Sequence, residues 1–184
     1  MADFNATLTK ALAQYIGDNM PTLQQVLDEW PTANIMMKLP AVSVTTLRSV
    51  MVPYQTARAV VGEVDLDENT ASVLYQVGHH DATLQIDVWA KSKPERATLS
   101  DLLSDIINKD IIPAGLRLTL AGYENRVADV LITEKKYADG TSTAQTQEWR
   151  TIFTVVATCA AVRRSTEFVI TSSETVFDTP KTIE

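Results

Sequence analysis

The chain of 184 residues contains one cysteine, two histidines and six glycines, and each low count excludes a class of function. A single cysteine, Cys159, cannot form an internal disulfide, so the fold must depend on packing. The six glycines form neither a GxGxxG nor a GxxxxGK[ST] pattern, so no phosphate-binding loop is predicted. The longest apolar run, Val155 to Val162, is far shorter than the roughly 20 residues that cross a bilayer. Nothing near Met1 combines a basic with an apolar segment. We therefore expect a soluble, unprocessed, intracellular protein.

Groups that could perform catalysis or hold a metal are also scarce. His79 and His80 are adjacent, and neighbouring residues in a turn rarely point at one metal ion. No GxSxG elbow occurs, and Cys159 falls in an apolar strand, where a thiolate is disfavoured. Carboxylates that could pair lie in polar segments and read as solvated charge. We therefore expect no enzymatic activity, no cofactor and no metal.

The net charge of −7 argues against a nucleic-acid grip. Proteins that hold phosphates present clustered Lys and Arg. Here the densest basic sites are the pairs Lys135-Lys136 and Arg163-Arg164, each beside acids or at the end of an apolar strand. We expect DNA to be repelled rather than bound.

Hydrophobic periodicity predicts two amphipathic helices. In the first, apolar residues recur at helical spacing from Phe4 to Ile16, and Gly17 stands where a C-terminal cap belongs. The second begins at Ser92, whose hydroxyl can accept a first-turn N–H while Glu95 reaches back. Its apolar stripe must lie on a sheet. The stripe consists of Leu99, Leu102, Leu103, Ile106 and Ile107.

Between the helices the pattern predicts mainly strands. Residues 21–39 carry scattered apolar residues and two prolines, for which we expect a short helix and then irregular structure. A strand through Val42 and Val44 follows, with an arm after it. Residues 72–77 and 83–89 alternate as an antiparallel hairpin whose turn is Gly78 to Asp81.

After the second helix we expect three further strands, over residues 116–120, 127–133 and 148–161. The last is apolar on both faces, so it is predicted to lie centrally. Residues 135–147 are polar and contain the turn dipeptide Asp139-Gly140, which indicates a loop too long for a tight hairpin and mobile when free.

These patterns predict one α+β domain: a mixed, mainly antiparallel β-sheet with an N-terminal helix and a central helix packed on one face, plus extended arms. The domain covers residues 1–164, of which 21–69 are an extended insertion or arm. Residues 165–184 form a polar C-terminal tail with two apolar knots, 168–170 and 176–177. Such a tail suits strand addition to a neighbouring subunit, and disorder is the alternative interpretation.

The order of elements carries a resemblance. An amphipathic N-terminal helix is followed by a β-hairpin whose second strand runs from Leu84 to Ala90 and contains Asp87-Val88-Trp89. The helix capped by Ser92 comes next, and two or three strands close the order with residues 149–161. Over residues 3–19 and 71–162 this resembles the tail-terminator and tail-completion proteins of tailed bacteriophages. The resemblance implies about six copies in a ring that caps the tail tube and faces the neck, with DNA passing through unbound. It implies a virion protein assembled in the host cytoplasm, with tail-tube and neck or connector proteins as partners and a sheath or sheath terminator in a contractile tail.

We expect subunits to dock through the hairpin tip, the polar loop and the tail. The residues concerned are His79, His80, Asp81, Tyr137, Asp139, Gly140, Phe168, Ile170, Val176 and Phe177. Two alternatives remain open. One is another virion part, such as a tube, sheath-associated or connector-adaptor subunit. The other is a small enzyme or ligand-binding domain with a pocket under the second helix.

Overall fold

The computed structural model describes residues 3–31, 37–65, 70–108, 110–111, 114–141 and 147–168. The two helices and a mostly antiparallel sheet form a mixed α+β fold, which confirms the predicted class. In chain order the elements are α1 (Phe4–Asn19), β1 (Gln25–Leu27), β2 (Ala41–Asp65), β3 (Thr70–Ala90), α2 (Lys93–Ile107), β4 (Asp110–Ile111), β5 (Ala114–Leu120), β6 (Arg126–Thr141) and β7 (Gln147–Phe168).

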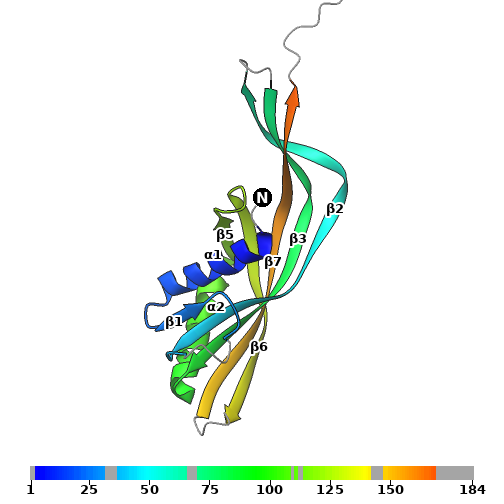
Figure 1. The fold of residues 1–184 in the computed structure, drawn as a ribbon. Coiled ribbons are helices and arrows are strands. Elements are labelled where there is room, and N and C mark those ends of the chain that lie inside the picture. Colours follow the sequence, from blue (N-terminus) through cyan, green and yellow to red (C-terminus); the bar gives the residue numbers. More distant parts are fainter. Residues whose placement is uncertain are drawn as a thin grey trace, which may run out of the picture.

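The strands form one curled sheet in the order β1-β2-β3-β7-β6-β5-β4 (Figure 1). Of the described strand pairs, β1 with β2 is parallel and the others are antiparallel. The prediction that the last strand lies centrally is confirmed, because β7 has β3 on one side and β6 on the other.

Three strands are much longer than a typical strand of about 5–6 residues. β2 has 25 residues, β3 has 21 and β7 has 22. They stay paired until Asp65 meets Thr70 and Thr70 meets Phe168, well beyond the last pairing of β7 with β6 at Cys159. The result is a three-stranded extension of the sheet, here called the ribbon, which rises away from the helices in Figure 1.

The predicted hairpin turn at Gly78 to Asp81 is wrong. These residues continue β3 and pair with β2 on one side and β7 on the other. Gly78 allows the backbones of β3 and β2 to approach closely, because a Cβ atom at this position would lie 2.3 Å from the Val52 carbonyl oxygen. The real β2–β3 connection falls at residues 66–69, outside the described residues.

Three smaller expectations are also corrected. Residues 135–147 are not one loop, since β6 continues to Thr141 and β7 begins at Gln147. The described part of residues 21–39 contains the strand β1 and no helix. Gly17 lies inside α1, which ends one turn later with Met20 as its C-cap. In each case pairing or packing with distant residues overrides the local signal.

Both helix starts follow from their sequences. Asp3 caps α1, its Oδ1 accepting the Asn5 backbone N–H at 3.0 Å. Ser92 caps α2 as predicted, its Oγ accepting the Glu95 N–H at 3.3 Å. The Glu95 carboxylate accepts the Lys91 N–H at 2.6 Å, so it reaches one residue further back than a capping box requires.

The main core lies between the helices and the sheet. The α1 stripe and most of the α2 stripe are buried there with residues from β2, β3 and β5 to β7. Two hydrogen bonds join elements across it: Tyr15 Oη donates to the Ile106 carbonyl at 3.2 Å, and Ser100 Oγ donates to Thr151 Oγ1 at 2.7 Å. The largest fully buried side chains are Phe153, Leu8, Leu12, Ile16, Met20, Leu84, Ile86, Leu103, Ile107, Leu120, Val42 and Val44.

Candidate subunit-docking surface

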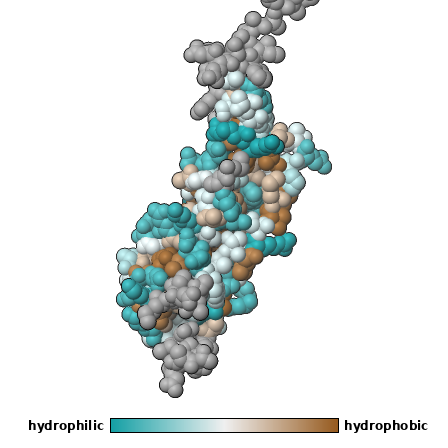
Figure 2. All heavy atoms as spheres, in the orientation of Figure 1, coloured by the Kyte–Doolittle hydropathy of each residue, from teal (hydrophilic) through white to brown (hydrophobic). Residues whose placement is uncertain are grey.

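The outer edge of β2 is the most exposed apolar feature of the described residues. β1 covers β2 only at Ala41 to Ser43, and beyond that point no described strand lies on its outer side. Large hydrophobic side chains are exposed along this edge, and Figure 2 shows hydrophobic residues reaching the surface along the ribbon. We call them the β2 apolar strip: Leu47, Val50, Met51, Val52, Tyr54 and Val60.

The strip occupies both faces of β2. Residues directly opposite on antiparallel strands project to the same face. Val50 lies opposite Asp81 and Val52 opposite His79, whereas Met51 lies opposite His80. At this level large hydrophobic side chains are therefore exposed on both faces of β2. Antiparallel sheets commonly bury such side chains on one face and carry polar residues on the other.

His79 and Asp81, two of the predicted docking residues, join the strip on one face. His79 Nε2 lies 3.3 Å from Asp81 Oδ2, and its ring centroid lies 5.8 Å from that of Tyr54. Thr158, on β7, donates a hydrogen bond from its Oγ1 to Asp81 Oδ1 at 3.2 Å. The two residues border exposed apolar surface in the middle of a strand, not at the tip of a hairpin.

His80 points to the other face and makes internal contacts. Its ring stacks on Phe4 at a centroid distance of 4.4 Å, and its Nε2 shares a hydrogen bond of 2.9 Å with the Tyr123 hydroxyl. Burial lowers the pKa of His80, and the nearby His79 lowers it further by a smaller amount. With Met51 these side chains border a cavity of about 360 Å³. His80 therefore ties the start of α1 to the ribbon.

The other predicted docking residues lie elsewhere. Tyr137 is 56% exposed on β6, with the Arg96 guanidinium 4.4 Å from its ring centroid. Asp139 and Gly140 are also in β6 and pair with Trp149 and Glu148, at the end of the sheet opposite to the ribbon tip (Figure 1). They are not brought together with His79 and Asp81. Phe168 ends β7, and the remaining predicted residues, Ile170, Val176 and Phe177, lie outside the described residues.

A buried ion pair lies on the sheet face opposite to α2. Asp87 on β3 is fully buried, and its Oδ1 accepts a hydrogen bond from Arg150 Nε at 2.8 Å. The same oxygen lies 2.7 Å from Arg150 Nη2 in an ion pair. The guanidinium also lies over the rings of Trp30 and Trp89, at 4.7 and 4.6 Å from their centroids. Burial raises the pKa of Asp87, opposed by hydrogen bonds from Gln85 and Arg150. This cluster fastens the segment before β2 to the sheet.

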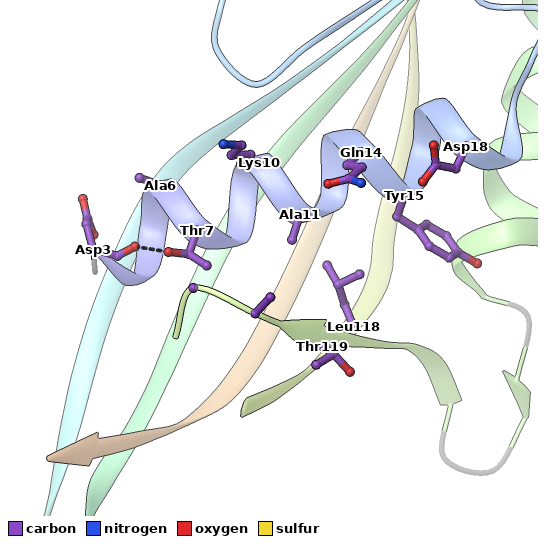
Figure 3. Close-up of a pocket in the computed structure, with 12 residues that line it drawn as sticks. Asp3, Ala6, Thr7, Lys10, Ala11, Gln14, Tyr15, Asp18, Leu118 and Thr119 are labelled. Carbon is purple, nitrogen blue, oxygen red and sulfur yellow. Dashed lines mark hydrogen bonds between the residues drawn. The ribbon is translucent and has the colours of Figure 1, made fainter. Parts of the chain in front are cut away.

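A groove lies between α1 and β5, on the side of β5 that carries no strand beside residues 116–120 among those described. Its volume is about 650 Å³. Figure 3 shows α1 along one side and β5 with its following turn along the other. The lining residues named in that view are Asp3, Ala6, Thr7, Lys10, Ala11, Gln14, Tyr15, Asp18, Leu118 and Thr119.

Sequence patterns gave no signal for the β2 strip or the groove. Alternation fails in residues 47–60 because apolar side chains project from both faces, so the segment resembled an irregular arm. The groove joins elements separated by about a hundred residues, and no local motif marks such a junction.

The described residues contain no group of three or more His, Cys, Asp or Glu that could hold a metal ion. Cys159 is buried, and burial raises the pKa of its thiol to about 11. No helix in the described part of the chain is long and apolar enough to span a membrane. Models of known protein families give no match to the chain, and a search of curated proteins finds no similar sequence.

Proposed function

We propose that this chain is a structural subunit that assembles with copies of itself and has no catalytic role. The observation that carries the proposal is the β2 apolar strip, six large hydrophobic side chains left exposed on an edge strand. Surfaces of this kind mark protein–protein contacts, because leaving them in water costs free energy that a partner can recover.

The two-sided exposure of β2 favours a ring over a two-fold dimer. A two-fold contact uses the same patch on both copies, so it covers one face of the strip and leaves the other in water. In a ring each copy has two neighbours that meet it through different surfaces. Val50 and Val52 on one face and Met51 on the other can then be covered by different parts of the assembly.

We propose further that the ring is a tail terminator or completion protein of a tailed phage. The resemblance in element order supports this. The ribbon goes beyond what a minimal terminator needs, and such an extension suits a contractile tail, where the cap also meets a sheath or its terminator. Its partners are the tail tube, the neck or connector proteins and, in a contractile tail, a sheath or sheath terminator. The net charge of −7 suits a channel through which DNA passes without being held.

The first test is the mass of the purified protein by light scattering after size exclusion, with negative-stain images of the same peak. We expect closed rings of about six copies, as the resemblance implies. Long tubes would move the assignment to a tail-tube subunit. A monomer at all concentrations would contradict self-assembly.

A matched pair of valines tests the strip itself. Val52, in the strip, is 39% exposed, and Val127, on β6, is 36% exposed. Val52→Lys removes about 1.5–3 kcal/mol of apolar burial at each contact. This lowers the association constant of the contact by about tenfold or more. Val127→Lys should leave the mass unchanged. Equal effects of the two substitutions would refute the role of the strip.

A further inference from the structure

The groove between α1 and β5 is suited to an extended strand. β5 pairs with β6 without a register shift from Leu116 to Leu120, so its backbone is regular. On the groove side its backbone groups face no described strand, and an added strand could pair with them. Leu118 and Ala11 supply apolar lining, while Lys10 and Asp18 stand at the groove on α1.

We propose that this groove receives residues 169–177 from the C-terminal segment of a neighbouring copy, as a strand added to the edge of β5. This inference rests on the proposed self-assembly and names its second contact. The segment begins where β7 ends and carries apolar residues at both ends, Val169-Ile170 and Val176-Phe177. Five polar residues, 171–175, separate the two ends. Apolar residues at intervals are what an added strand uses to set its register.

The length of the ribbon keeps the start of this segment, residues 169–170, out of the chain's own groove. Leu118 pairs with Ala128, which pairs with Cys159, so the groove lies level with Cys159. Phe168 is nine residues further along β7, and at about 3.3–3.4 Å per residue this amounts to about 30 Å. A segment turning back at Phe168 would need about nine residues to return to this level, so Val169-Ile170 could not enter the groove. A neighbouring copy is free of this restriction.

Disulfide trapping between two full-length chains tests the proposal. One chain carries Thr119→Cys in the groove and the other, with a size tag, carries Thr175→Cys. Cys159 interferes little, because it is buried and its pKa is raised to about 11. We expect the Thr119→Cys and Thr175→Cys chains to form a disulfide-linked pair, because docking raises the effective concentration of the two thiols. In the control, Ala97→Cys, an exposed position on α2, replaces Thr119→Cys, and its disulfide with Thr175→Cys should form about tenfold more slowly.

A second pair of variants blocks the groove instead. Ala11→Arg places a long side chain in it and should reduce the trapping rate about tenfold, whereas Ala97→Arg makes the same change outside it and should not. Circular dichroism checks that both variants fold. Equal trapping at Thr119→Cys and Ala97→Cys would overturn the inference, as would a bridge formed within one monomer carrying both Thr119→Cys and Thr175→Cys.

Light scattering of the wild-type chain separates the two proposals. Assembly without trapping at the groove overturns this inference and leaves the proposed function standing. A monomer at all concentrations overturns both.

Discussion

Removing Arg150 should be the most damaging single change on the face of the sheet away from α2. Asp87 is completely buried and Arg150 is 20% exposed, so Arg150→Met leaves a buried carboxylate without its cation. Breaking such a pair costs about 3–5 kcal/mol. Methionine keeps the apolar contact with Trp30 and Trp89, so the loss reports mainly on the charge.

The assay is urea unfolding followed by tryptophan fluorescence. With an m-value of about 2 kcal/mol/M, the midpoint should fall by about 1.5–2.5 M. The control is Arg117→Met. Arg117 pairs with Asp129 at 3.5 Å, but both side chains are about 60% exposed, so its loss should cost less than about 1 kcal/mol.

The pH dependence supplies a second readout with a definite sign. Burial already raises the pKa of Asp87, and losing Arg150 removes an interaction that lowers it. The native variant then holds a proton at a pH where the unfolded chain has released it, so its stability rises as pH falls through this window. The gap between wild type and Arg150→Met should narrow as the pH falls towards the ordinary Asp pKa of about 3.9. Equal losses for Arg150→Met and Arg117→Met, or a gap independent of pH, would refute the reasoning.

Two further predictions concern the base of the ribbon, at Gly78 and His80. Gly78→Ala should lower stability by about 1–3 kcal/mol in the same assay, because the new Cβ meets the Val52 carbonyl. Gly17→Ala, whose Cβ has ordinary contacts at 3.7 Å inside α1, should instead stabilise by about 0.5–1 kcal/mol, and the same sign for both would contradict the structure. The lowered pKa of His80 means that the unfolded chain binds its proton first, so stability is lost as pH falls from about 6.5 through the native pKa. His80→Phe, which retains stacking but loses the bond to Tyr123, should flatten that part of the stability–pH curve, and an unchanged slope would count against His80 as its source.

Local patterns were sufficient for the elements whose signal is periodic. The stripes of α1 and α2, the cap at Ser92 and the alternation of β7 each depend on residues close in sequence. The length of β3 was missed because Gly78 to Asp81 has the composition of a turn. Only pairing with β2 and β7 holds these residues extended, and neither contact leaves a local trace.

The candidate sites were missed for a related reason. Asp87 and Arg150 are separated by 63 residues, and their contact depends on the register between β3 and β7. Either residue alone is an ordinary polar residue on the outer face of a strand. The expectation of docking at His79 and Asp81 placed them at an exposed tip. In the structure His79 and Asp81 lie beside the β2 apolar strip. The proposed docking role therefore depends on the hydrophobic side chains of that strip and not on an exposed turn.

The two proposed contacts call for different kinds of partner surface. Along β2 the register shifts near Thr46, Pro53 and Ala59, and Pro53 has no N–H to offer a partner. Bulges and prolines on an edge prevent copies from pairing indefinitely through their backbones. The β2 strip must therefore be covered by shaped side-chain packing, whereas the regular edge of β5 can accept a strand. Val52→Lys should then weaken assembly while disulfide trapping at Thr119→Cys persists among the copies that still associate. If Val52→Lys reduces assembly and the trapping rate by the same factor, the two contacts form one cooperative interface.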